Sequence, residues 1–239
     1  MLTFHKIFLK LIGYRENCSV TIAEADKCAK KLLFEGDRDR LVPKNDTELD
    51  EHCRIMTENM KCLEKHAKCY KPFPKQIFNM VLIHVKSAYK GRCISKPGRD
   101  EFMHHMTCIK TPEDSEPAHQ CLDRWTIQME LISEEYVIED QFPGVCCSFH
   151  MMKSCLVDSV TKLCANSTGI ESAKYTEKMM METFSDFLDL ACGRQKNLED
   201  CDKTFRNGTQ RLADVVKDGV PPQNGSALFH AIKIVTRHD

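Results

Sequence analysis

The apolar positions of this chain recur every three or four residues over most of its length, which is the spacing of one face of an α-helix. Asp46 or Thr47 stands where a helix cap is expected, just before the clearest apolar series. That series consists of Leu49, Cys53, Met56, Met60, Leu63, Ala67 and Tyr70. A second series with the same period runs from Val145 to Leu163. Alternation with period two is absent over any useful length, so no sheet is expected.

Prolines divide the chain into pieces of helical length, because proline disrupts the interior of a helix. We expect further helices at about 75–91, 98–110, 118–135 and 170–192, each apolar on one face. The pattern predicts an all-α fold, a helical bundle of about six to eight helices. The prolines are Pro43, Pro72, Pro74, Pro97, Pro112, Pro117, Pro143, Pro221 and Pro222.

Cysteine usage adds a strong constraint, because the chain holds 14 cysteines that are spread along it and not clustered. Zinc sites are typically built on Cys-x-x-Cys, or on Cys and His at tight spacing, and no Cys-x-x-Cys is present. The pattern therefore predicts a bundle stapled by disulfides and matured in an oxidising, secretory compartment. The candidate disulfide cysteines are Cys18, Cys28, Cys53, Cys62, Cys69, Cys93, Cys108, Cys121, Cys146, Cys147, Cys155, Cys164, Cys192 and Cys201.

Two pairs of cysteines share a nine-residue spacing, Cys53 with Cys62 and Cys155 with Cys164. At about 100° per residue, this spacing places the two members on opposite sides of a helix, so each must reach a different neighbour. Cys62 and Cys69 are seven residues apart and share a face, which suits bridges to a single neighbouring helix.

Residues 111–117 form a linker-like stretch, and seven cysteines lie on each side of it. If every cysteine is paired, an odd number of bridges crosses this stretch and ties the two sides together. We therefore expect one cysteine-rich helical domain over 18–201, whose two halves meet near 111–117. The connectivity stays open, because the number of pairings is on the order of 10⁵. The cysteine-free segment 202–239 is expected to be glycosylated and partly mobile.

Five of the eight asparagines stand in Asn-x-Ser/Thr sequons without an intervening proline. Chance predicts about one such motif among eight asparagines, since Ser and Thr make up roughly a tenth of the chain. The excess again indicates a secreted, extracellular glycoprotein. The candidate glycosylation sites are Asn17, Asn45, Asn166, Asn207 and Asn224.

Residues 1–17 hold a short apolar patch interrupted by Lys10, which is weak for a signal-peptide core. We interpret them as a degenerate or incomplete signal region, with the true start upstream of Met1. No apolar stretch reaches the roughly 18–20 residues of a transmembrane helix, so no membrane span is expected. With 34 basic and 35 acidic residues and no long run of either sign, the charge pattern does not favour nucleic acid as a partner.

Candidate chemistry is sparse along the chain. His104, His105 and Cys108 lie close together, but a cysteine held in a disulfide is not available as a metal ligand. No serine nucleophile elbow, phosphate loop or dinucleotide fingerprint occurs. We therefore expect no metal, no cofactor, no catalytic residues and no enzymatic activity.

The run Cys146-Cys147-Ser148-Phe149-His150 resembles the Cys-Cys-x-x-His element of secreted phospholipase A2. In that family the histidine is the general base for a calcium-bound water, so the resemblance implies a hydrolase as a remote alternative. The aspartate that follows the histidine there is Met151 here, and the glycine-rich calcium loop is missing. We expect His150 to be an ordinary helix residue beside a disulfide.

Methionines favour a binding function, since flexible thioethers line adaptable apolar cavities well. Packing in a solid core is the simpler interpretation of the same residues. Those on or near the expected apolar faces are Met56, Met60, Met80, Met103, Met106, Met129, Met152 and Met179.

The run 48–53, Glu-Leu-Asp-Glu-His-Cys, and the cysteine ladder after it resemble the arthropod family of 27 kDa haemolymph glycoprotein-like secreted proteins. The ladder includes the adjacent Cys146 and Cys147, and the resemblance covers about residues 25–201. It implies an extracellular, cysteine-rich, helical glycoprotein and supplies no catalytic residues.

These observations predict a secreted glycoprotein that binds or carries a small apolar ligand in a body fluid or secretion. The ligand-binding residues are unknown at this stage. The alternative is an extracellular protein-interaction or immune-related scaffold, whose partner is another extracellular protein.

Overall fold

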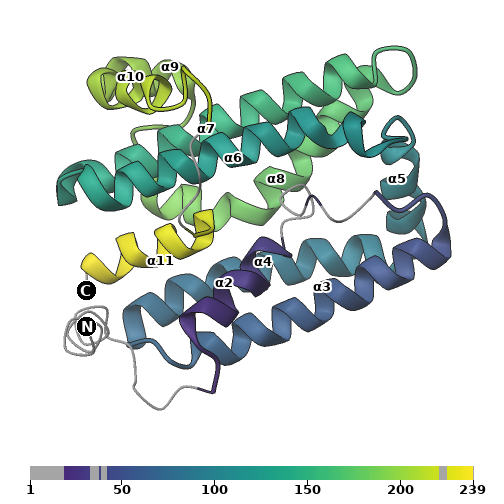
Figure 1. The fold of residues 1–239 in the computed structure, drawn as a ribbon, viewed down its shortest axis with the longest axis horizontal. Coiled ribbons are helices and arrows are strands. Elements are labelled where there is room, and N and C mark those ends of the chain that lie inside the picture. The colour runs from purple at the N-terminus through teal and green to yellow at the C-terminus, as the bar shows by residue number, and fades with distance from the viewer. Residues whose placement is uncertain (1–18, 33–37, 39–41, 221–224, 239) are drawn as a thin grey trace.

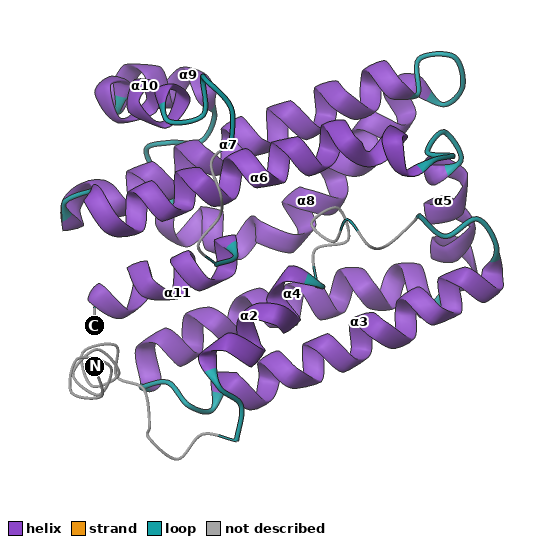
Figure 2. Cartoon of the chain, in the orientation of Figure 1, coloured by secondary structure: helices purple, strands orange, loops and turns teal. Residues whose placement is uncertain are grey.

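The computed structural model describes residues 19–32, 38, 42–220 and 225–238, and within these ranges the chain forms helices and no strand (Figure 1 and Figure 2). This confirms the all-α prediction. The helices of these ranges are α2 (Ile22–Lys30), α3 (Asp46–Ala67), α4 (Pro72–Ile94), α5 (Lys96–Met106), α6 (Pro112–Glu135), α7 (Ile138–Leu163), α8 (Gly169–Ala191), α9 (Leu198–Thr204), α10 (Arg206–Asp214) and α11 (Ala227–Arg237). They exceed the expected six to eight, because α2, α9 and α10 are too short to give a clear periodic signal.

The linker expected at 111–117 is the first part of α6, so that prediction is wrong. Pro112 occupies the first turn, where its missing N–H costs nothing, and Thr111 and Asp114 form a capping box. Pro117 and Pro143 lie inside α6 and α7 and do not separate helices as expected. The cap of α3 is Asn45, one residue before the expected positions, and its side chain accepts a hydrogen bond from the Glu48 N–H at 2.9 Å.

The helices pack in two groups with α11 between them (Figure 1). In the first group α3 packs against α2 and α4, around a core that includes Met56, Leu63 and Phe78. In the second group α7 packs against α6 and α8, around a larger core that includes Ile132 and Phe149. Contacts of α4 with α8, and of α11 with both α4 and α6, join the two groups.

The disulfides follow this division. Within the described residues the bridges are Cys28–Cys62, Cys53–Cys93, Cys108–Cys164, Cys121–Cys155, Cys146–Cys192 and Cys147–Cys201. The first two join α3 to α2 and α4, and the other four lie between residues 108 and 201. Cys108–Cys164 crosses 111–117, yet none of the six bridges spans residues 94–107. The covalent boundary between the halves therefore lies around α5 and not near 111–117.

Cys69 is also disulfide-bonded, and Cys18 lies outside the described residues, as do the expected signal region 1–17 and residue 239. The cysteine-free segment after Cys201 is not the loose tail that we expected. Leu212 of α10 is fully buried and Ile234 of α11 is 1% exposed, and both belong to the core of the second group. The described part of 202–239 is thus built into the fold.

Candidate functional site

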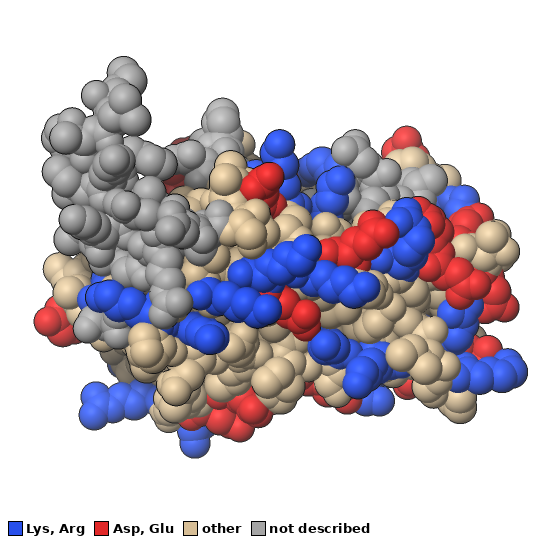
Figure 3. All heavy atoms as spheres, turned by 90° about the horizontal axis from the view of Figure 1, so that it is seen from below, with Lys and Arg blue, Asp and Glu red and all other residues tan. Residues whose placement is uncertain are grey.

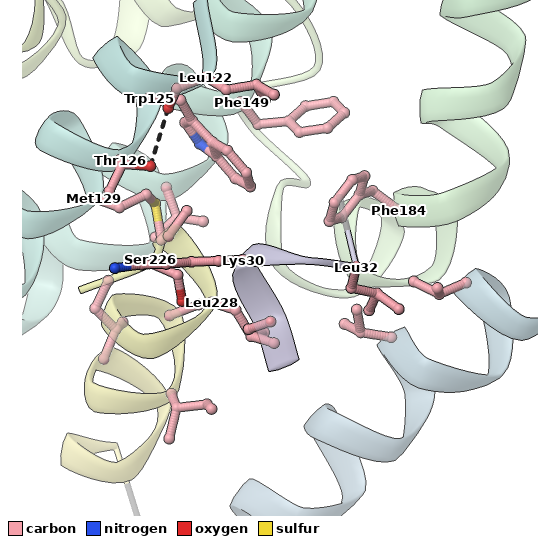
Figure 4. A pocket seen from close by; sticks show the side chains of 18 of the residues that line it. Lys30, Leu32, Leu122, Trp125, Thr126, Met129, Phe149, Phe184, Ser226 and Leu228 are labelled. Carbon is pink, nitrogen blue, oxygen red and sulfur yellow. Dashed lines mark hydrogen bonds between the residues drawn. The ribbon is translucent and has the colours of Figure 1, made fainter. Parts of the chain in front are cut away.

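A cavity of about 1250 Å³ lies between the two groups of helices (Figure 4). One wall comes from α2, α3 and α4, and the other from α6, α7, α8 and α11. Figure 4 shows Trp125, Phe149 and Phe184 converging on this space from α6, α7 and α8. The aromatic residues that line the cavity are Tyr70, Phe78, Trp125, Phe142, Phe149, Phe184 and Phe187.

Helical periodicity explains how α11 completes the wall. One face of α11 lines the cavity, because its lining residues are spaced by three, one and three positions. These residues are Leu228, Ala231, Ile232 and Val235. Ser226 caps the helix, since its side chain accepts a hydrogen bond from the Phe229 N–H at 3.2 Å. The C-terminal helix therefore closes a face that the disulfide-linked helices leave open.

Two residues of the lining, Trp125 and Asn59, each carry a buried hydrogen-bond donor that does not face the cavity. Trp125 is 7% exposed and Asn59 is 9% exposed. Trp125 Nε1 and Asn59 Nδ2 are shielded from solvent and have no hydrogen-bond partner among the described residues. Buried side-chain atoms without such a partner also occur away from the cavity, at His119 Nδ1 and Gln141 Oε1, so they do not mark the cavity in particular. No pattern in the sequence singled out either residue.

Charged residues form the rim. The Arg38 guanidinium pairs with the Asp123 carboxylate at 2.6 Å and also with Glu116. These two carboxylates raise the pKa of Arg38, and Arg38 in turn lowers the pKa of Glu116. The remaining charged lining residues are all basic and exposed: Lys27, Lys30, Lys31 and Arg124. The rim thus carries an excess of positive charge.

Most of the eight methionines that favoured a binding function do not line this cavity, and several pack in a core as the simpler interpretation expects. Of the eight, Met129 lines it. Met56 and Met60 pack in the core of the first group, and Met106 packs against α3 beside Phe102. Met152 and Met179 line a small neighbouring pocket of about 50 Å³. Met80 and Met103 are half-buried.

His150, the candidate general base, is buried in α7 away from the cavity lining. Its Nε2 donates to the Gln195 carbonyl at 2.9 Å, and burial lowers its pKa. The neighbouring Cys146 and Cys147 are bridged to Cys192 and Cys201. His150 is therefore a buried helix residue beside two disulfides.

Of the histidine pair beside Cys108, His105 packs against α8. Cys108 is bridged to Cys164, and the His105 ring stacks on Tyr175 with centroids 4.7 Å apart. His105 Nδ1 lies 3.3 Å from the Ser172 hydroxyl. Across the described ranges no group of three or more His, Cys, Asp or Glu side chains is arranged to hold a metal ion.

Three candidate glycosylation sites, Asn45, Asn166 and Asn207, are exposed. Asn166 lies in the turn between α7 and α8, Asn207 lies in α10, and Asn45 caps α3. Asn17 and Asn224 fall outside the described residues. On the face seen in Figure 3, acidic and basic side chains are interspersed. None of the helices in the described ranges is both long and apolar enough to span a bilayer.

Comparison with known proteins gives no relative: no family model, no curated protein and no solved structure matches this chain. The resemblance to the haemolymph glycoprotein-like family therefore stays a prediction from the cysteine ladder alone.

Proposed function

We propose that this protein is a non-enzymatic carrier, which holds a small apolar ligand in the cavity between its two groups of helices. The observation that carries the proposal is the size and lining of that cavity, about 1250 Å³ lined largely by aromatic and aliphatic side chains. Small-molecule sites in proteins are typically apolar concavities of about 300–1000 Å³ with a few polar groups. This one is large enough for a sizeable ligand.

The cavity is open to solvent at its charged rim, so its volume measures the room for a ligand and not an enclosed void. Its inner wall is formed mainly by aromatic and aliphatic side chains. An apolar ligand placed against these side chains would remove their surface from water, which contributes about 25 cal/mol per Å² of apolar surface. This burial is the driving force that we propose for binding.

We propose that the carrier works outside the cell. The disulfide framework and the five sequons favour a secreted glycoprotein, and the resemblance to the haemolymph glycoprotein-like family agrees with a body fluid. The alternative, a protein-interaction scaffold, would be favoured by one large exposed apolar patch. The large apolar side chains that are most exposed in the described residues are Ile83, Ile94, Ile170, Leu190 and Val137.

The test is native mass spectrometry of the protein secreted from a glycosylating eukaryotic cell, after enzymatic deglycosylation. We expect extra mass in the native state that disappears on denaturation. The chain has a single tryptophan, Trp125, on the cavity wall, so its emission reports a ligand directly. Protein stripped of ligand should respond in emission to long-chain fatty acids and neutral lipids. Absence of both the extra mass and any emission response would refute the proposal.

A further inference from the structure

Basic residues are concentrated in one part of the first group of helices. Residues 61–99 contain ten lysines and arginines and a single acidic residue, Glu64. The whole chain has nearly equal numbers of basic and acidic residues, so the rest of it carries a net negative charge. The balanced total therefore conceals a strongly basic segment, which spans the end of α3, all of α4 and the start of α5.

Five of these residues gather where α3 ends and α4 begins. We call Lys61, Lys65, Lys68, Lys71 and Lys75 the lysine patch. The first three are spaced by four and three positions, so they share one face at the end of α3. Because α3 and α4 form a helical hairpin (Figure 1), the other two lie at the same end of it. Four of the five are exposed, and Lys75 is half-buried.

Acidic partners do not neutralise the lysine patch. Glu64 pairs with Lys86, outside the patch, at 3.1 Å. Apart from Lys71, the lysines of the patch form no ion pair within the described residues. Basic side chains suit the C-terminal end of α3, but Lys71 and Lys75 lie at the N-terminal end of α4, where the helix dipole favours acidic ones. These two lysines work against the stability of α4, which indicates a role other than folding.

An aromatic side chain stands among these charges. Phe73 lies between Lys71 and Lys75 in the sequence, in the first turn of α4, and is 39% exposed. Its neighbours Tyr70 and Pro74 are buried and line the cavity. The turn from α3 to α4 therefore has one side on the cavity and another side that presents lysines and a phenylalanine to solvent.

We propose that this turn docks on an anionic lipid surface, with the lysine patch at the head groups and Phe73 inserted at the boundary with the acyl chains. The negative surface potential of such a membrane attracts basic side chains, and an apolar side chain beside them adds burial at the interface. A sulfated polysaccharide would engage the lysines but would leave Phe73 without an apolar contact. Docking goes beyond the proposed carrier function, and it would bring one wall of the cavity close to a source of apolar ligand.

The test is co-sedimentation of the secreted, disulfide-bonded protein with vesicles of phosphatidylcholine alone and with vesicles that also contain phosphatidylserine. We expect binding to the anionic vesicles only. Binding should be stronger at an ionic strength of about 0.01 M than at about 0.15 M, because the Debye length falls from about 30 Å to about 8 Å. Equal binding to the two kinds of vesicle would overturn the proposal.

Two triple variants with the same change of net charge locate the contact. A basic side chain close to an anionic surface contributes about fivefold in affinity, so removing three should weaken binding about a hundredfold. The patch variant is Lys68→Gln, Lys71→Gln and Lys75→Gln. The matched control replaces three exposed lysines of α7, α8 and the turn after α10 and should bind almost as the wild type does: Lys162→Gln, Lys174→Gln and Lys217→Gln. An equal loss in both triple variants would overturn the proposal.

Single variants test the insertion of the aromatic ring. We expect Phe73→Ala to weaken binding to the anionic vesicles about tenfold, since the ring loses its burial at the interface. Ile170→Ala, at an exposed apolar position in α8, is the control and should leave binding unchanged. Unchanged affinity of Phe73→Ala would overturn the insertion.

A soluble polyanion separates the two kinds of partner. Binding to heparin without binding to the phosphatidylserine vesicles would overturn the lipid surface in favour of a polysaccharide. The vesicle measurement needs no cargo, so its failure leaves the carrier proposal standing. Failure of the carrier proposal, with no extra native mass, likewise leaves the docking result standing.

Discussion

Filling the cavity from its α11 wall should stabilise the protein, and Ala231→Phe is the change that tests this. Ala231 is half-buried, lines the cavity and is the fifth residue of α11. Burial of a phenylalanine side chain contributes about 1.5–3 kcal/mol. Phenylalanine is a weaker helix former than alanine by roughly half a kcal/mol. The net expectation is a gain of about 1–2 kcal/mol.

The matched control is Ala173→Phe. Ala173 is likewise the fifth residue of its helix, α8, but it is 4% exposed and packs against Val160 and Cys164. The same side chain has no free space there, and overpacking a core costs about 1–3 kcal/mol. Because both sites share their position in a helix, the helix-propensity cost is the same and the comparison isolates the available space.

The assay is urea unfolding with the disulfides intact, followed by the emission of Trp125, together with thermal unfolding. For a chain of this length, 1 kcal/mol corresponds to about 2–4 °C in Tm, so Ala231→Phe should raise Tm by about 2–8 °C. Ala173→Phe should lower it. If both variants are destabilised to the same degree with unchanged urea dependence, the space beside Ala231 is already packed and the cavity argument is wrong.

Two further predictions concern the framework. Replacing Cys108 and Cys164 together by serine opens a loop of 56 residues, and loop-closure entropy predicts a loss of about 4 kcal/mol in urea unfolding; a loss below 1 kcal/mol would contradict this account. Burial lowers the pKa of His66, His150 and His230, so these rings stay neutral in the folded state. The unfolded chain takes up protons first, so this stability is complete above about pH 6.5 and is lost as the pH falls further. Urea midpoints that rise between pH 6.5 and 5 would refute it.

The sequence predicts the long helices well because each of them buries one continuous face. The six expected helices correspond to α3–α8, with ends that differ by a few residues. The error at 111–117 came from treating Pro112 as a breaker, although proline is favourable in a first turn. Thr111 and Asp114, spaced as a capping box, are the signal that would have identified the start of α6.

The cavity could not be predicted from the sequence, because residues that face a cavity and residues that face a packed core have the same periodicity. Methionine drew attention for its flexibility, yet that flexibility lets Met56 and Met60 fill a core. Trp125 and Asn59 lie on the lining, but neither belongs to a spacing pattern that distinguishes a cavity wall from a packed core. Only the packing of two groups of helices around a shared space reveals them.

The position of the disulfides has a mechanical consequence. Each cavity wall belongs to one of the two groups of helices. Each of the six bridges of the described residues lies within one group and does not connect it to the other. Across the seam lie reversible contacts, such as Arg38 with Asp123 and His84 with Asp186 at 2.7 Å. The two groups of helices can therefore separate without breaking any of these six bonds, and the bonds within each group keep its helices together. If the protein carries a ligand as proposed, we expect uptake and release of that ligand to depend on ionic strength and not on redox state.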